Sequence, residues 1–249
     1  MADLAGGPLC GVDGCADPVQ RIAAGVTQSA AASALELSIV SDAICPWCYI
    51  GKRRLEKALV ALGPAARVRT VWRPFELNPD MPKDGIERHV YRMHKFGSLE
   101  RSKALDAQVT EAAEGEGLSF RYDLIQRTPN TFDAHRLLWL AGETGDKQDA
   151  LMEAIFRAYF TEGRNIGDRA VLWELAPTGG IEPARARAFL DGETGAAEVN
   201  RDQGIAKRTG LSGVPAFVAQ GRLLFSGAQP SDVMGAVLGQ LVTVPVRRS

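Results

Sequence analysis

The chain has 249 residues, enough for one large domain or two interleaved ones, so its core can form without a stapling disulfide or metal. Its 29 lysine and arginine residues and 30 aspartate and glutamate residues give a formal net charge of −1, which offers no electrostatic attraction to nucleic acid or to an anionic membrane. No apolar run approaches the ~20 residues of a membrane-spanning helix. Residues 1–20 also lack the apolar core of a secretory signal, so we expect a cytoplasmic protein.

All four cysteines lie in the first fifth of the chain, at Cys10, Cys15, Cys45 and Cys48. The absence of any later cysteine argues against a scaffold held together by disulfides. In the cytoplasm lasting structural disulfides are rare, so a closely spaced pair is more often catalytic or metal-binding.

The first ordered unit is predicted to be a strand, a helix and a second strand. Residues 1–34 are rich in Ala and Gly without a sustained period, and we expect a flexible tail. A buried strand follows over residues 35–44, a helix from Pro46 that ends before Gly63, and a strand over residues 68–75. For such a unit a parallel, right-handed crossover is expected.

The pattern then becomes helical before strands return near the end. Helices are predicted over residues 85–97, 99–116, from 132, over 151–159, 171–176, from 183, and over 199–210. Two strands over residues 215–220 and 222–226 suit a tight hairpin, and Pro230 opens a last helix. The order predicts an α/β fold in which residues 35–80 and 200–249 form a discontinuous sheet domain and residues 81–199 an inserted all-helical domain.

The turn Cys45-Pro46-Trp47-Cys48 lies where the first strand gives way to the first helix. Pro46 suits the first helical position, which places Cys45 at the helix N-terminus, where free N–H groups and the helix dipole favour a thiolate. Cys48 lies within one turn and can form a disulfide with Cys45. We therefore predict that Cys45 is the attacking cysteine and Cys48 the resolving cysteine.

Two further features are expected to belong to this centre. Pro215 follows Val214 at a strand start, and a cis bond there would face the cysteine turn and leave the Val214 backbone free to bind a substrate peptide. Trp47, between the cysteines, is expected to be exposed beside the sulfur as an apolar platform.

Four stretches of the sequence occur together, in this order, in one family. They are residues 41–51 (SDAICPWCYIG), 130–137 (NTFDAHRL), 213–218 (GVPAFV) and 225–230 (FSGAQP). In these stretches the chain resembles the DsbA-like branch of the thioredoxin superfamily, specifically its FrnE-type members, over residues 35 to about 242. The resemblance implies a thioredoxin fold with an inserted helical domain, disulfide exchange at Cys45 and Cys48, and a cis bond before Pro215.

The chain also departs from the family pattern. Periplasmic oxidases of the wider family carry His where this chain has Trp47, so a less oxidising potential is expected here. Cys10 and Cys15 lie outside the pattern. They are either incidental thiols of a solvated tail or an auxiliary pair that exchanges with Cys45.

Several alternatives remain open at this stage. Cys45 and Cys48 are interpreted as redox-active rather than as an inert pair or half of a zinc site, and no metal or bound cofactor is expected. Asp42 is either a polar group at the strand end or a group that tunes the cysteines or transfers protons. His135, on the apolar face of its helix, is either a packed core histidine or a base near the Cys45 sulfur.

The leading function is a protein-disulfide oxidoreductase that acts on protein or small-molecule thiols and disulfides, with glutathione as a further candidate co-substrate. One alternative is a glutathione-dependent isomerase or transferase of the 2-hydroxychromene-2-carboxylate isomerase or kappa type, acting on a small aromatic compound. Those enzymes resemble this chain but typically carry a Ser or a lone nucleophile at the position of Cys45. A non-enzymatic alternative is a redox-regulated chaperone or binding protein. A homodimer is compatible with the helical insert.

Overall fold

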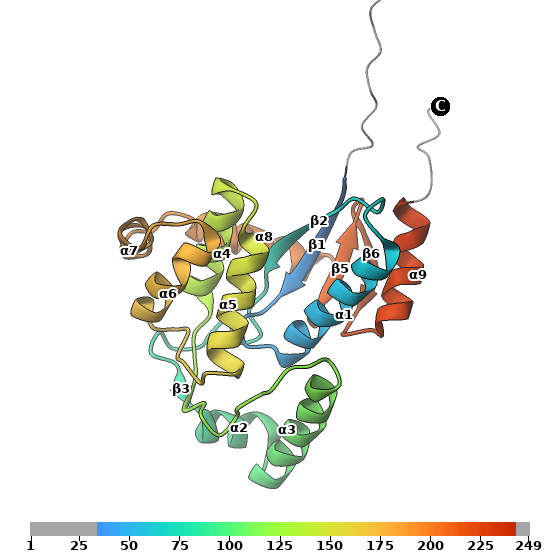
Figure 1. The fold of residues 1–249 in the computed structure, drawn as a ribbon. Helices are drawn as coiled ribbons and strands as arrows, with labels where there is room; N and C mark the ends of the chain where they lie inside the picture. Colours follow the sequence, from blue (N-terminus) through green and yellow to red (C-terminus); the bar gives the residue numbers. More distant parts are fainter. Residues whose placement is uncertain (1–33, 243–249) are drawn as a thin grey trace, which may run out of the picture. The chain divides into compact units, whose positions relative to one another are not determined.

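The computed structural model describes residues 34–242 (Figure 1). Residues 1–33 lie outside this described part, and with them Cys10, Cys15 and nearly all of the predicted tail. The described part holds a four-stranded sheet, a two-stranded sheet and the helices around them. None of the helices in residues 34–242 is long and apolar enough to span a membrane.

The four-stranded sheet is mixed, with the strand order β2-β1-β5-β6. Its strands are β1 (Leu35–Ser41), β2 (Val68–Pro74), β5 (Ala216–Ala219) and β6 (Arg222–Ser226). β1 pairs in parallel with β2, as predicted, and β5 is antiparallel to both of its neighbours. The hairpin turns at Gln220 and Gly221, whose φ angles of 52° and 72° are those of the predicted two-residue turn.

The end of the first strand was predicted three residues too late. β1 ends at Ser41, and the chain then turns instead of continuing to Ile44. The reason is local hydrogen bonding by Asp42, because its carbonyl accepts from the N–H of Cys45 at 3.1 Å and its carboxylate from the N–H of Ile44 at 3.4 Å. Aspartate commonly turns the chain in this way.

Two helices pack side by side against the sheet, α1 (Pro46–Leu62) and α9 (Ser231–Val242) (Figure 1). Pro46 occupies the first turn of α1, where its missing N–H costs no helical hydrogen bond. Gly63, with a φ of 79°, ends the helix. The sheet and this helix pair therefore fix the direction in which the N-terminus of α1 points.

The chain between β2 and β5 is mainly helical. Its elements are β3 (Ile86–Glu87), α2 (Arg88–Phe96), α3 (Leu99–Glu114), β4 (Arg127–Thr128), α4 (Phe132–Thr144), α5 (Gln148–Phe160), α6 (Arg169–Leu175), the 3₁₀ helix η2 (Ala176–Gly179), α7 (Pro183–Asp191) and α8 (Ala196–Arg208). The apolar stripe predicted over residues 151–159 is confirmed as core, since Leu151, Met152 and Ile155 are fully buried. The division into a sheet domain and an inserted helical domain stays a prediction.

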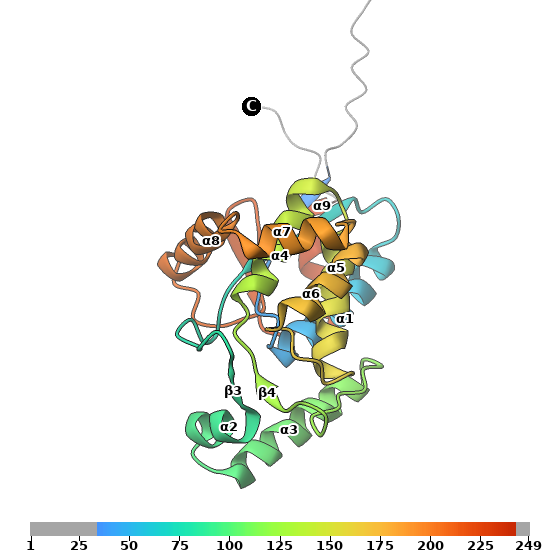
Figure 2. The same ribbon diagram turned by 90° about the vertical axis from the view of Figure 1, so that its left-hand side faces the viewer.

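The helix predicted from residue 85 begins later, at Arg88. Residues Ile86–Glu87 form β3 and pair with β4, so the two short strands run together toward α2 and α3 (Figure 2). Gly85 has a φ of 67°, and a Cβ there would lie 2.5 Å from the carbonyl oxygen of Thr128. The close approach of the two backbones therefore requires glycine and prevents the helix from starting earlier.

A side chain of α5 pairs with the outer edge of β2. The amide oxygen of Gln148 accepts from the N–H of Trp72 at 2.8 Å, and its nitrogen donates at 3.1 Å both to the carbonyl of Trp72 and to that of Leu138. The side-chain amide thus makes the hydrogen bonds that a neighbouring strand would make. Without it, buried backbone groups at this sheet edge would be unpaired.

We expect Gln148→Leu to lower the free energy of unfolding by about 3 kcal/mol, because leucine fills the space but leaves the buried backbone groups of Trp72 without partners. Urea unfolding followed by circular dichroism measures the loss. Gln108→Leu, at an exposed position of α3, is the matched control and should change the free energy by less than about 0.5 kcal/mol. Equal effects of the two substitutions would contradict this role for Gln148.

A buried ion cluster fixes α1 against α5. The ammonium of Lys52, with 4% of its side chain exposed, lies 3.1 Å from Asp149 and 3.2 Å from Glu153, and it also contacts Glu56. Burial opposes the charge of Lys52, but the three carboxylates outweigh it and raise the pKa of Lys52 above its ordinary value. One turn earlier in α1, the Tyr49 hydroxyl donates to Glu153 at 2.7 Å. These contacts hold the helix that carries the cysteines against the helical block.

Candidate active site

The cysteine turn caps the N-terminus of α1. Cys45 is the N-cap residue, with an extended backbone, and the N–H of Cys48 donates to its carbonyl at 3.0 Å. Both cysteines are free thiols, 5% and 1% exposed, whereas Trp47 between them is 38% exposed. The turn therefore presents an indole at the surface with the two sulfurs behind it.

The segment around Pro215 reaches this turn from the other end of the sequence. The Val214–Pro215 peptide bond is cis, and the Cys45 thiol donates to the Val214 carbonyl with a sulfur–oxygen distance of 3.6 Å. Hence this carbonyl, which we expected to be free for a substrate, faces the thiol. A Cβ added at Gly51 would lie 3.1 Å from Pro215 Cγ, so glycine lets α1 approach the proline closely.

Cys48 lies deeper than Cys45, and its surroundings disfavour its thiolate. Burial raises the pKa of Cys48 well above its ordinary value, and the neighbouring Cys45 side chain adds to the rise. Hydrogen bonding by the side chain of Ser41 and the backbone of Asp42 opposes it. A thiol of this kind needs help to lose its proton near neutral pH.

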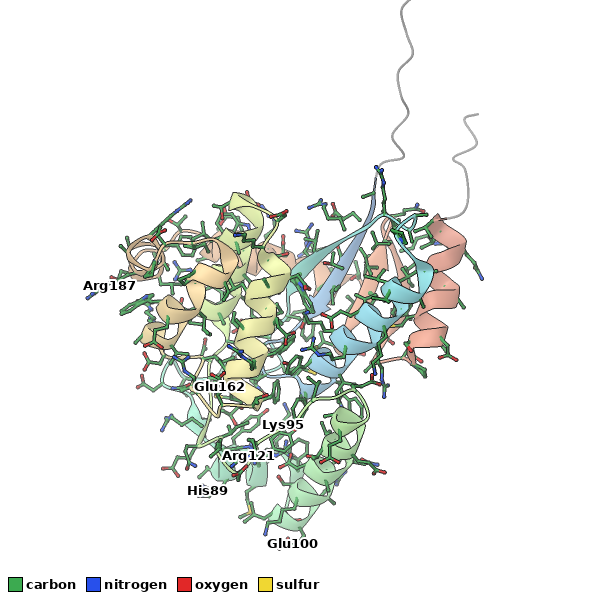
Figure 3. The ribbon with its side chains drawn as sticks, in the orientation of Figure 1. His89, Lys95, Glu100, Arg121, Glu162 and Arg187 are labelled. Atoms are coloured by element: carbon green, nitrogen blue, oxygen red, sulfur yellow. The ribbon has the colours of Figure 1, made fainter. Side chains whose placement is uncertain are left out.

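Asp42 and His135 meet beneath the turn, and both are buried. One carboxylate oxygen of Asp42 accepts from the N–H of Leu77 at 2.7 Å. The other lies 3.5 Å from Nε2 of His135 on α4. The contact of His135 is thus with the Asp42 carboxylate. The other histidines, His89 and His94, are exposed on α2, and His89 lies on its outer side (Figure 3).

Two buried residues of this region, Glu76 and Gln203, were not predicted from the sequence. Glu76, 6% exposed, follows β2, and its carboxylate accepts from the side chain of Gln203 on α8 at 2.9 Å. Its N–H donates in return to the Gln203 amide oxygen at 3.0 Å. Burial raises the pKa of Glu76, with Gln203 and His135 acting in the opposite direction. The sequence feature that could have indicated this buried pair is the single acidic residue between the apolar Phe75 and Leu77 at the end of a predicted strand.

Two cavities adjoin these buried groups. One, of about 270 Å³, is lined by Ser41 and His135 among others. The other, of about 1200 Å³, is lined by Glu76, Gln203 and Lys207 among others. Ser41 and His135 thus border one cavity, and Glu76 and Gln203 border the other.

Comparison with known proteins places this arrangement in a family. Residues 36–239 match the model of the DSBA-like thioredoxin domain. A probable DsbA oxidoreductase from Streptomyces coelicolor is 36% identical, with a TM-score of 0.76 over 86% of this chain and 94% of its own. The residues that match the family model include both the cysteine turn and the cis-proline segment.

Two more distant structures share the fold alone. A 2-hydroxychromene-2-carboxylate isomerase is 13% identical, with a TM-score of 0.62 over 83% of this chain and 96% of its own. The cytosolic disulfide reductase DsbM from Pseudomonas aeruginosa, solved with glutathione, is 21% identical, with a TM-score of 0.59 over 83% and 99%. Together with the mixed sheet and its helical cover, the family match confirms the predicted fold class: the chain belongs to the DsbA-like thioredoxin domain family.

Proposed function

We propose that the protein is a thiol–disulfide oxidoreductase in which Cys45 attacks and Cys48 resolves. The observation that carries the proposal is the pair of free cysteines at the N-terminus of α1, with the Cys45 thiol directed at the Val214 carbonyl beside a cis-proline. Membership of a family with oxidoreductases among its members supports the same activity.

The proposed reaction has two steps. The Cys45 thiolate attacks one sulfur of a substrate disulfide, forms a mixed disulfide and releases the other substrate sulfur as a thiolate. Cys48 then loses its proton and attacks the Cys45 sulfur, so the Cys45–Cys48 disulfide forms and the second substrate thiolate leaves. The substrate is reduced and the enzyme oxidised, and a second thiol pair can reverse both steps. Trp47 supplies an exposed apolar surface for the substrate chain.

Protein disulfides, small disulfides and glutathione are the partners that this chemistry implies. A glutathione-dependent isomerase has no use for a second thiol, whereas Cys48 lies one helical turn behind Cys45. The likeness to the isomerase lies below the identity at which activity transfers, and so does the likeness to DsbM. A redox-regulated binding protein would form the disulfide but would not turn over substrate.

The test is a titration of the purified chain in glutathione redox buffers, with thiols trapped by alkylation at low pH and mapped by mass spectrometry. We expect Cys45 and Cys48 to interconvert as one couple, with a potential more reducing than the value of about −120 mV known for DsbA. A lone glutathione adduct on Cys45, or a pair that stays reduced throughout, would contradict the proposal and favour the isomerase.

A further inference from the structure

The larger cavity, of about 1200 Å³, lies at the carboxyl end of β2. Its walls come from the segment after β2, the start of α4, the loop before α6 and helix α8, and neither cysteine of the turn is among the described residues that line it. Ligand sites commonly have volumes of about 300–1000 Å³, and in α/β sheets they lie outside the carboxyl ends of parallel strands. The cavity therefore has the size and the place of a ligand site that the proposed disulfide exchange does not use.

One carboxylate that lines this cavity is held in place with an oxygen to spare. Glu76 is 6% exposed, and its carboxylate accepts from the side-chain nitrogen of Gln203 at 2.9 Å, while its N–H donates to the Gln203 amide oxygen at 3.0 Å. These two bonds fix the orientation of the carboxylate. In the described part of the chain, its other oxygen, Oε1, is buried without a hydrogen-bond partner. Because an unpaired buried acceptor costs about 1–3 kcal/mol, this oxygen calls for a donor that the chain itself does not supply.

The arginines that line the cavity are engaged elsewhere. Arg136 and Arg169 each bind the carboxylate of Asp133 at 2.7 Å. Arg127 donates to two backbone carbonyls, at 2.9 and 3.0 Å. Among the described residues none of these guanidinium groups is paired with Glu76, so its carboxylate has no cation in contact.

The surroundings of Glu76 favour an ammonium group as the missing donor. Burial raises the pKa of Glu76, since an ionised carboxylate is costly in a buried space unless a cation accompanies it. A guanidinium binds best through both carboxylate oxygens, whereas a compact ammonium needs only the one that Gln203 leaves free. The exposed lining residues, such as Lys207 and Glu193, carry both signs and are screened by water, so the buried carboxylate sets the preference.

We propose that this cavity is a binding site for a primary alkylammonium group, which donates to Glu76 Oε1 while Gln203 orients the carboxylate. Such a group occurs in free aliphatic amines and in the lysine side chains of polypeptides. The site is independent of the thiol chemistry, because it requires neither cysteine. It is nevertheless close to the cysteine turn, since the neighbouring Leu77 N–H donates to the Asp42 carboxylate at 2.7 Å.

Calorimetric titration of the full-length chain with 5-amino-1-pentanol tests the site, with 1,5-pentanediol as the neutral match. We expect the amine to bind at least about tenfold more tightly than the diol, because a charge-assisted hydrogen bond replaces an unpaired acceptor. Glu76→Gln can keep its bonds to Gln203 but loses the charge, and it should reduce this preference to less than about twofold. Glu193→Gln, an exposed carboxylate of the same cavity, is the matched control and should retain the preference.

A second variant leaves the buried pair intact. Lys207 is exposed on α8, one turn after Gln203, and lines the cavity. At low ionic strength Lys207→Gln removes a like charge and should tighten binding of the amine about two- to threefold without affecting the diol. Lys103→Gln, at an exposed position of α3, is its control and should change neither affinity.

Three results would overturn the proposal. They are equal binding of amine and diol by the parent chain, a folded Glu76→Gln that keeps the tenfold preference, and an unchanged affinity for the amine in Lys207→Gln. The first of these would mean that water alone occupies the cavity.

A pair of short peptides, one with a central lysine and the other with norleucine at the same place, distinguishes the two sources of the ammonium. Preference for the lysine peptide that is lost in Glu76→Gln identifies a polypeptide side chain as the occupant. Binding of 5-amino-1-pentanol without binding of either peptide identifies a free aliphatic amine. Either result supports the ammonium site, whereas a lysine preference that Glu76→Gln retains would place the peptide on another surface and contradict it.

Discussion

Cys45→Ser is expected to abolish disulfide exchange, with a loss of at least about a thousandfold in the rate of reduction of a protein disulfide. The reason is that the Cys45 sulfur faces the cis-proline segment, where a substrate chain can approach, whereas Cys48 lies behind it and is only 1% exposed. Serine preserves the size and the hydrogen bond to Val214 but supplies no thiolate. An insulin-reduction assay with a recycling thiol measures the loss.

Cys48→Ser is the informative counterpart, because it removes resolution and leaves the attack intact. It should accumulate a mixed disulfide between Cys45 and the substrate, visible by non-reducing electrophoresis and mass spectrometry. The control is Cys10→Ser with Cys15→Ser, which should retain turnover if the tail thiols are incidental. Full activity of Cys45→Ser, or a mixed disulfide on Cys48 in the parent chain, would reverse the proposed assignment.

Arg136→Leu is expected to lower the free energy of unfolding by about 3–5 kcal/mol, the largest effect on stability that we predict. The Arg136 guanidinium is buried and donates to the carbonyls of Phe189, Gly192 and Thr194 at 2.6–3.1 Å. It also donates to Asp133 at 2.7 Å. Leucine would leave these carbonyls and the carboxylate without a partner between α4 and the segment that leads into α8.

Chemical unfolding followed by far-ultraviolet circular dichroism measures this loss. Arg136→Lys should recover only part of it, because one ammonium cannot reproduce the planar set of donors that reaches the carbonyls. Arg185→Leu, at an exposed position of the adjacent α7, is the matched control and should change stability by less than about 0.5 kcal/mol. A similar effect at both positions would show that the carbonyl network of Arg136 contributes little.

The predictions made from the sequence held where the signal was local. Pro46 at the first turn of α1 and Gln220-Gly221 in the hairpin each act within a few residues. The apolar stripe of α5 likewise requires only helical periodicity. Two predicted element boundaries were wrong. β1 ends early because Asp42 forms a hydrogen-bonded turn, and α2 begins late because residues 86–87 pair with β4 instead.

The sequence by itself determined the cysteine turn, its place at a helix start and the fold class, because neighbouring residues encode these through backbone preference and apolar spacing. Only the tertiary structure decided which distant groups meet: Cys45 with Val214 across 169 residues, Asp42 with His135, and Glu76 with Gln203. A polar side chain can pair with many partners of equal chemistry, and the choice among them is made when helices and strands far apart in the chain pack together. The roles of Asp42 and His135 were thus open alternatives in the sequence, and Glu76 was not recognised until α8 and the end of β2 were placed side by side.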